Sequence, residues 1–226
     1  MRKQITKILY NINCRPLLLF YHKVIGRSHF RLAKGNVFNS TTSVIYRSAI
    51  TIKKGCRNNA IIVGENSNIW NSRIEIKGSN NKVTIGKNSF LNGLVVIVEG
   101  DNNNIFIGDN AFILDDTRMY VVDGSTLTIG NGVMCSDRID IRTTDNHAII
   151  DIATNKRINK EEDIVIGDNV WIGTGVKVLK GANIVGGGII GAGCIITRSV
   201  ETEPNSIIAG SPAHVVRRGV RWTMER

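Results

Sequence analysis

His147 is the residue of this chain whose type and position most clearly suggest chemistry. It lies in the stretch TTDNHAIID (143–151) and is the only histidine between His29 and His214. A neutral imidazole, with a pKa of about 6.5, can take the proton from a hydroxyl group and so turn a poor nucleophile into a good one. A lone histidine can equally be a hydrogen-bonded structural residue, so the elements around it have to decide between the two interpretations.

A repeat precedes the histidine, and a shorter one follows it. Aliphatic-Gly pairs recur every 22 residues, beginning at Val63, Ile85, Ile107 and Ile129. Asn-rich turns (CRNNAI, GSNNKV, GDNNNI) precede these pairs, as expected at corners that need a positive φ. From Ile166 to Glu201 the unit has six residues: IGDNVW, IGTGVK, VLKGAN, IVGGGI, IGAGCI and ITRSVE.

This spacing indicates the fold class. A six-residue period would rotate the apolar positions around a helix, whereas short strands joined by tight corners keep them on the inside. Three such sides make a coil of about 18 residues, and coils stack at about 4.8 Å. The 22-residue unit fits one coil with a longer corner. The sequence therefore predicts an all-β chain that forms a triangular β-solenoid.

The repeat is interrupted at the histidine. The next aliphatic position would be residue 147 itself, and the aliphatic-Gly pair at Ile166 follows Ile129 by 37 residues instead of 22. Residues 142–163 are therefore predicted to form a loop that leaves the solenoid, and such loops are usually functional. Asp145 or a backbone carbonyl could orient the imidazole of His147.

Trp171 follows shortly after this loop. Positions one and five of the six-residue unit face inward, so the sixth position faces outward. The equivalent outward positions in earlier coils are Asn68, Phe90, Phe112 and Met134. We expect a column of exposed apolar side chains that ends in Trp171, near the root of the loop. Such a patch is typical of a ligand wall or a subunit contact.

The net charge of +10 is unevenly distributed. Residues 1–64 contain twelve Lys or Arg and no acid before Glu65, and the C-terminal RRGVRWTMER is also basic. Such a field attracts polyanions. Nucleic acid, an acidic membrane surface and an acidic polysaccharide all fit, as does a surface that only keeps the protein soluble.

Four stretches resemble a known family: TTDNH, NKRINKEEDIVIGDNVWIGTGV, IIGAGCIITR and IIAGSPAHVVR. Over roughly residues 60–217 the chain is similar to the galactoside, maltose and polysaccharide O-acetyltransferases of the hexapeptide-repeat family. The resemblance implies a left-handed parallel β-helix, acetyl-CoA as co-substrate, and a homotrimer with active sites between neighbouring prisms. His147 matches the family's general base, and Trp171 matches the tryptophan that lines the tunnel where thioester and acceptor meet.

The resemblance also implies a donor site. Family members hold acetyl-CoA with corner residues after the tryptophan and in the last coils, and the matching positions are Thr174, Ala192, Thr197 and Arg198. Arg217 matches the arginine at the adenosine phosphate end of the cofactor. A backbone N–H at a Gly-rich corner is the natural donor to the developing oxyanion.

The acceptor is less determined than the donor. Length, loop and tryptophan spacing are similar to the O-acetyltransferases of capsular sialic acid polymers, and this resemblance implies polysialic acid as the acceptor. The positive charge supports an acidic polysaccharide, and no nucleic acid partner is expected. An acetyltransferase of a small sugar or sugar nucleotide, and a non-catalytic polyanion-binding solenoid, are the alternatives. A zinc enzyme would need three histidine ligands where the solenoid has one, so no metal is expected.

The domain organisation follows from these assignments. Residues 1–40 are expected to form a basic capping extension, residues 41–208 the β-helix, and residues 209–226 a basic tail. No run of about 18 apolar residues occurs and no signal-peptide cleavage site is evident. A cytoplasmic location is therefore expected, with peripheral association with a membrane-bound capsule machinery as an open alternative.

Overall fold

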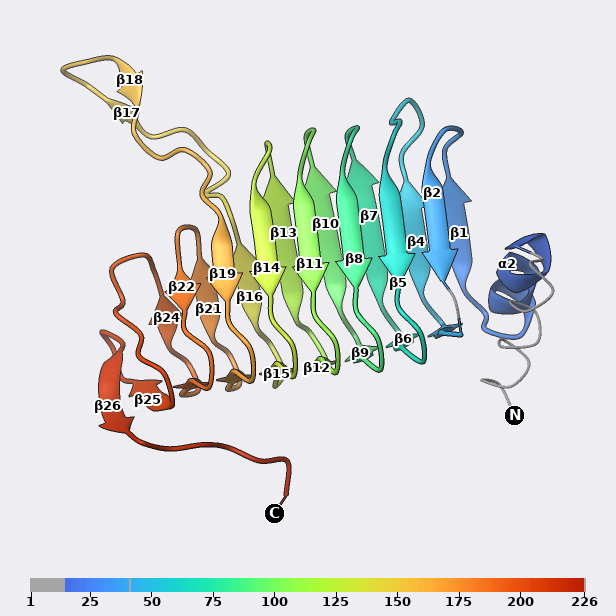
Figure 1. Cartoon of the computed structure of the whole chain (residues 1–226). Helices are drawn as coiled ribbons and strands as arrows, with labels where there is room; N and C mark the ends of the chain where they lie inside the picture. The colour runs from blue at the N-terminus through green and yellow to red at the C-terminus, as the bar shows by residue number, and fades with distance from the viewer. Residues whose placement is uncertain (1–14, 41, 226) are drawn as a thin grey trace.

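The protein is a β-solenoid with three faces. The computed structural model describes residues 15–40 and 42–225, so residues 1–14 of the expected extension lie outside it. As the chain advances from right to left in Figure 1, it runs up the far face and down the near face, which is a left-handed coil. The expected all-β solenoid is confirmed, and no helix of the described residues is long and apolar enough to cross a membrane.

Each face is one sheet. The first sheet contains β1 (His29–Leu32), β4 (Ala49–Ile52), β7 (Arg73–Lys77), β10 (Val95–Glu99), β13 (Arg118–Val122), β16 (Asp140–Arg142), β21 (Lys177–Leu179) and β24 (Ile195–Ile196). The second contains β2 (Val37–Ser40), β5 (Ala60–Val63), β8 (Lys82–Ile85), β11 (Asn104–Ile107), β14 (Thr126–Ile129), β19 (Ile164–Ile166) and β22 (Asn183–Ile184). The third contains β3 (Val44–Tyr46), β6 (Asn68–Trp70), β9 (Phe90–Asn92), β12 (Phe112–Ile113), β15 (Met134–Cys135), β20 (Trp171–Ile172), β23 (Ile189–Ile190), β25 (Ser206–Ala209) and β26 (His214–Arg218).

The Asn pairs of the 22-residue unit have two separate tasks. The first Asn of each pair adopts the positive φ of the corner, with φ of 56° at Asn58 and 59° at Asn80. The second is buried and links successive coils: the Asn81 backbone N–H donates to Asn59 Oδ1 at 2.9 Å, and that of Asn103 donates to Asn81 Oδ1 at 2.8 Å. Buried polar groups need such partners, so this ladder fixes the corner between the first and second sheets.

The glycine of each aliphatic-Gly pair is required by stacking. A Cβ built on Gly86 would lie 2.5 Å from the carbonyl carbon of Gly108, and one built on Gly108 would lie 2.6 Å from that of Gly130. Neither Gly86 nor Gly108 has a positive φ. The next coil passes too close for any side chain, while the aliphatic residue before each glycine, such as Ile107, points into a continuous apolar core.

The solenoid begins earlier than the expected residue 41. Strands β1 and β2 already pair in parallel with β4 and β5, so the first coil lies inside the segment expected to be a cap. The short helix α2 (Arg15–Val24) precedes this coil. Ser40 occupies the position of Val63 in the next coil. That polar residue replaces the aliphatic one of the repeat, which is why the repeat does not reveal this coil.

The C-terminal segment is also not a simple tail. Strand β26 pairs antiparallel with β25 at the end of the third sheet, with Ser206 opposite Arg218 and a register shift between Ile207 and Ile208. This antiparallel strand ends the parallel stack at the C-terminal coil. The expected tail region 209–226 thus contributes a strand before it becomes irregular.

The buried His22 of helix α2 should make the free energy of unfolding of the protein depend on pH. It is fully buried, its Nε2 lies 3.4 Å from Ser40 Oγ, and burial lowers its pKa from 6.5 to about 4. The unfolded chain therefore binds a proton near pH 6.5 that the folded chain takes up only near pH 4. The free energy of unfolding should fall as pH decreases between these values, by up to about 3 kcal/mol.

Chemical denaturation at pH 7, 5.5 and 4.5 measures this dependence. The variant His22→Phe should lose this part of the pH dependence, because it keeps the ring beside Phe30 and Tyr21 without a titratable group. His29→Phe, at an exposed position, is the matched control and should behave as the parent protein. Equal pH slopes for His22→Phe and the parent would contradict the prediction.

Candidate active site

The predicted loop leaves the solenoid between β16 and β19. It contains a short antiparallel hairpin of β17 (Ile150–Asp151) and β18 (Lys156–Arg157), which projects beyond the body of the solenoid in Figure 1. The backbone N–H of Glu162 donates to the carbonyl of Thr143 at 3.1 Å, which joins the two ends of the loop. The buried Thr143 hydroxyl accepts hydrogen bonds from Val122 N at 3.2 Å and Ser125 Oγ at 2.7 Å.

Two cations of the following coils hold the base of the loop. Lys180 Nζ lies 2.6 Å from Asp145 Oδ2, and Arg198 Nη2 lies 2.9 Å from Glu162 Oε1. The Lys180 hydrogen bond, followed by that of Asn159, holds the pKa of the Asp145 carboxyl below its usual range. The carboxylate therefore stays charged at neutral pH and keeps the loop attached to the solenoid.

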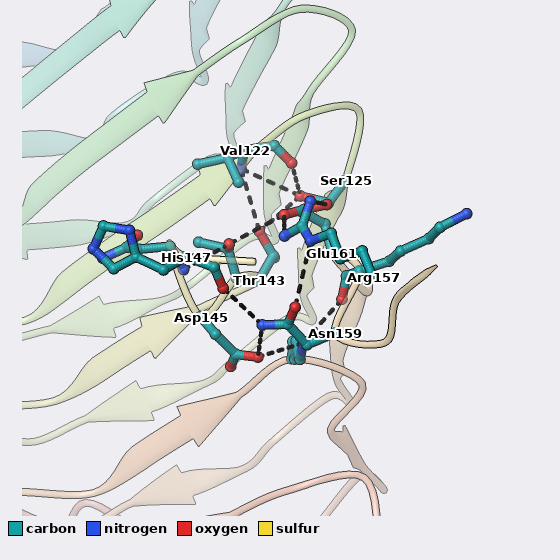
Figure 2. A network of polar contacts seen from close by, with 12 residues as sticks. Val122, Ser125, Thr143, Asp145, His147, Arg157, Asn159 and Glu161 are labelled. Atoms are coloured by element: carbon teal, nitrogen blue, oxygen red, sulfur yellow. Dashed lines mark hydrogen bonds and ion pairs between the residues drawn. The ribbon is translucent and has the colours of Figure 1, made fainter. Parts of the chain in front are cut away.

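Asn159 fixes the backbone at His147. Its side-chain amide donates to the His147 carbonyl at 2.8 Å and to Asp145 Oδ2 at 2.9 Å, while its Oδ1 accepts from Ile149 N at 2.6 Å. Only 6% of Asn159 is exposed. Figure 2 shows these contacts, with the imidazole of His147 pointing away from them.

The imidazole itself is exposed and has no hydrogen-bond partner among the described residues. Asp145, one of two groups that could have oriented it, is engaged with Lys180 and Asn159 instead. Both ring nitrogens of His147 are therefore accessible to a molecule that approaches from outside the loop. This is the arrangement that a proton-accepting side chain needs.

The outward column of the third sheet is present as predicted. Phe90 pairs with Phe112, Phe112 with Met134, and Met134 with Trp171 in the parallel register. Neighbouring rings touch: the centroids of Phe90 and Phe112 are 5.3 Å apart and stacked, and Trp70 extends the contact toward the N-terminal end. The side chain of Trp171 is 36% exposed.

The C-terminal segment covers part of this column. Trp222 Nε1 donates to the carbonyl of Asn169 at 2.6 Å, and its ring centroid lies 6.3 Å from that of Trp171. A cavity of about 460 Å³ lies between the column and residues 222–225. This volume is in the range of small-molecule sites, and its lining includes Phe112 and Met134.

His147 and Trp171 do not meet within one chain. The loop leaves from the corner between the first and second sheets, whereas Trp171 lies on the third sheet, on the side of the triangle opposite that corner. The strand β19 and its turn lie between the end of the loop and Trp171. The expectation that Trp171 lies near the root of the loop is therefore wrong.

The predicted donor residues lie at two corners and one terminal strand. Thr174 and Ala192 follow β20 and β23 and occupy the same position on adjacent coils, where Gly193 N donates to the Thr174 carbonyl at 2.8 Å. Thr197 and Arg198 follow β24 at the corner from which the loop leaves, and Arg198 pairs with the loop there. Arg217 is exposed on β26.

Sequence reasoning did not identify three residues of this region: Asn159, Lys180 and Trp222. Asn159 lies in the loop, where no repeat constrains residue types, and Lys180 is at the third position of the unit VLKGAN, a position for which the repeat requires no particular residue type. Trp222 lies 51 positions after Trp171 in an irregular segment. It is the only Trp, Tyr or Phe of residues 209–226, which is the signal that could have indicated a docking contact.

Comparisons with known proteins agree with this fold. No protein-family profile matches the chain. A polysialic acid O-acetyltransferase of Neisseria meningitidis is 31% identical over 142 residues, covering 63% of this chain and 64% of the relative. One of Escherichia coli O1:K1 is 33% identical over 102 residues, covering 45% of this chain and 33% of the relative. The chain thus spans less than two thirds of the length of these relatives.

Two solved structures match a larger part of the chain than these relatives do. The polysialic acid O-acetyltransferase OatWY superposes with a TM-score of 0.82 at 28% identity, covering 88% of this chain and 92% of that one. The polysialic acid-specific acetyltransferase NeuO superposes with a TM-score of 0.61 at 27% identity, covering 78% of this chain and 83% of that one.

The fold class expected from the motifs, a left-handed β-helix, is confirmed. In sequence and in fold, the chain is similar to polysialic acid O-acetyltransferases, in agreement with the resemblance that the motifs indicated.

Proposed function

We propose that this protein is an acetyl-CoA-dependent O-acetyltransferase that acetylates hydroxyl groups of an acidic polysaccharide, with polysialic acid as the expected acceptor. The proposal is supported above all by the match to OatWY, which covers 88% of this chain and 92% of that one with a TM-score of 0.82. The excess of ten positive charges supports an anionic acceptor.

His147 is the general base in this proposal. Its imidazole accepts the proton of an acceptor hydroxyl as the oxygen attacks the thioester carbonyl carbon. When the tetrahedral adduct collapses, the carbon–sulfur bond breaks and the proton is returned to the leaving thiolate. The products are an acetyl ester and a free thiol, so no covalent intermediate on the protein is required. Exposed ring nitrogens and a backbone fixed by Asn159 suit this task.

The residues at the corner after Trp171 fit a thioester donor. The backbone N–H groups of Thr174 and Ala192 donate no hydrogen bond within the described residues, so they are free to bind carbonyl oxygens or a developing oxyanion. The exposed guanidinium of Arg217 has no ion-pair partner there and suits a phosphate. Thr197 and Arg198 would complete the donor site from the loop corner.

A site that uses both His147 and Trp171 requires a second copy of the chain. One prism presents them on opposite sides, whereas neighbouring prisms in a closed ring can bring the loop of one against the third sheet of the next. We therefore propose a homo-oligomer, with three copies as the family resemblance implies, and one active site at each contact.

Transfer from radiolabelled acetyl-CoA to a panel of glycans tests the proposed function. Polysialic acid should be labelled, whereas a neutral polysaccharide and a short neutral sugar should be labelled at least tenfold less at equal concentration, because they lack the charge that the basic surface attracts. Preferential labelling of the short neutral sugar would support a small-sugar enzyme. Binding of polysialic acid without any transfer would indicate a non-catalytic solenoid.

A further inference from the structure

We propose that the protein holds its acidic acceptor at a second site, remote from His147, in a basic cavity between the first two coils. The inference rests on the proposed function, since it concerns the acceptor of that reaction. The ligand class is a carboxylate-bearing segment of the polymer, several sugars away from the one that is acetylated.

The cavity is lined by cations and contains no acid. It has a volume of about 490 Å³ and lies at the corner after β1 and β4. Its charged lining residues are Arg31, Lys34, Lys53, Lys54 and Arg57. All five are exposed, and among the described residues only Lys53 has an ion-pair partner, Glu75 at 2.9 Å. Four positive side chains thus face solvent with no carboxylate to neutralise them.

A neighbouring cavity continues the basic surface. It is lined by Lys23, Arg27, His29 and Arg31, and therefore shares Arg31 with the first. Because no Asp or Glu precedes Glu65, the charge of the first coil is not compensated locally by its own segment. Such concave, one-signed surfaces concentrate anions more strongly than isolated lysines do.

The position of the cavity relates it to the catalytic loop. The turns after β1 and β4 stand on the same edge of the prism as the turn from which the loop of residues 143–163 leaves, as the upper edge in Figure 1 shows. Four strand spacings separate β4 from β16, or about 19 Å at about 4.8 Å each. Only a polymer of several sugars spans that distance, so a short acceptor cannot use both sites.

The turns between the cavity and the loop carry negative charge, which favours contact of an acidic polymer with the cavity and the loop but not with the turns between them. Asp101 and Asp123, both exposed, lie on the turns between the cavity and the loop and repel an acidic chain. The cavity also lacks aromatic side chains, so it offers no platform for stacking nucleic acid bases.

The proposed donor residues all lie on the C-terminal coils. Thr174 and Ala192 are at a different corner, whereas Thr197 and Arg198 are at this edge but beyond the loop. The cavity is therefore separated from the proposed coenzyme A site along the solenoid axis.

Steady-state kinetics of full-length Lys54→Glu and Arg57→Glu with two acceptors test the proposal. For long polysialic acid, each variant should raise KM roughly tenfold with kcat retained, because a reversed charge weakens polymer capture without altering the transfer site. For the sialic acid disaccharide, KM and kcat should both match the parent. The shift in KM should shrink as salt increases.

Lys87→Glu is the matched control, since Lys87 is an exposed lysine on another corner outside the cavity, and it should leave both acceptors unaffected. Equal KM values for long polymer in all proteins would overturn the second site while leaving the proposed function intact. A KM change for acetyl-CoA instead would show that the cavity serves the cofactor, which also overturns it. If the parent labels no acidic glycan at all, the proposed function itself fails.

Discussion

Replacement of His147 by Ala should reduce acetyl transfer to polysialic acid by about 10²- to 10⁴-fold, the usual contribution of a general base. His147 is the only histidine of the loop, and its imidazole points away from the polar contacts that hold its backbone. Because its side chain is exposed and makes no hydrogen bond, the substitution should leave the fold and the melting temperature unchanged. Single-turnover transfer of labelled acetyl groups measures the loss in kcat.

His214→Ala is the control for this experiment. His214 is also exposed, on β26, where its Nδ1 lies 3.0 Å from the Pro212 carbonyl. Its loss should change transfer by less than about threefold, since it belongs to the strand that ends the stack and not to the loop. Full activity of a folded His147→Ala protein would exclude His147 as the base and favour a binding role for the loop.

The fold could be predicted from the sequence because stacking imposes periodic requirements on residue type. Gly108 has to lack a side chain where Gly130 passes, and Asn81 has to bridge two coils from a buried position. These requirements recur at a fixed interval and are therefore visible as a repeat. The first coil could not be recognised from the repeat, because Ser40 replaces the aliphatic residue that marks the later coils. Ser40 instead contacts His22 of helix α2.

The sequence indicates candidate residues for the site, whose roles stay predictions, but it led to a wrong expectation of their arrangement. The interruption indicated His147, and the outward sixth position indicated Trp171. The repeat does show that the loop replaces the corner before the aliphatic-Gly strand at Ile166, and that Trp171 begins the strand after it. The expected contact failed because residues close in sequence lie on different sides of the triangle. The polar contacts of Asn159 leave no periodic signal in the sequence, because each contact that holds the loop occurs only once.

Mixing two inactive variants should restore activity if the site forms between copies. His147→Ala and Trp171→Ala should each transfer poorly alone, since every contact in a homo-oligomer then lacks one partner. In a freely mixed ring prepared by co-expression, a contact is complete when its loop comes from the Trp171→Ala chain and its third sheet from the His147→Ala chain. With equal amounts of both chains, about one quarter of the contacts meet this condition, so about a quarter of the parent activity should return.

Complementation is expected because of the geometry of the single chain. The corner between the first and second sheets, from which the loop leaves, faces away from the third sheet, so no side-chain movement can bring His147 and Trp171 of one chain together. A double variant that carries both substitutions on one chain, co-expressed with an excess of parent chain, is the control for simple dilution. The activity of this mixture, divided by the amount of parent chain, should not exceed that of the parent protein alone. If the mixed single variants stay as inactive as each alone while forming mixed oligomers of the parent size, then His147 and Trp171 act within the same chain or not at one site. In that case the third sheet would form the contact between copies, through the column that contains Phe90 and Phe112. The residues that hold the acceptor against His147 would then lie at the corner from which the loop leaves.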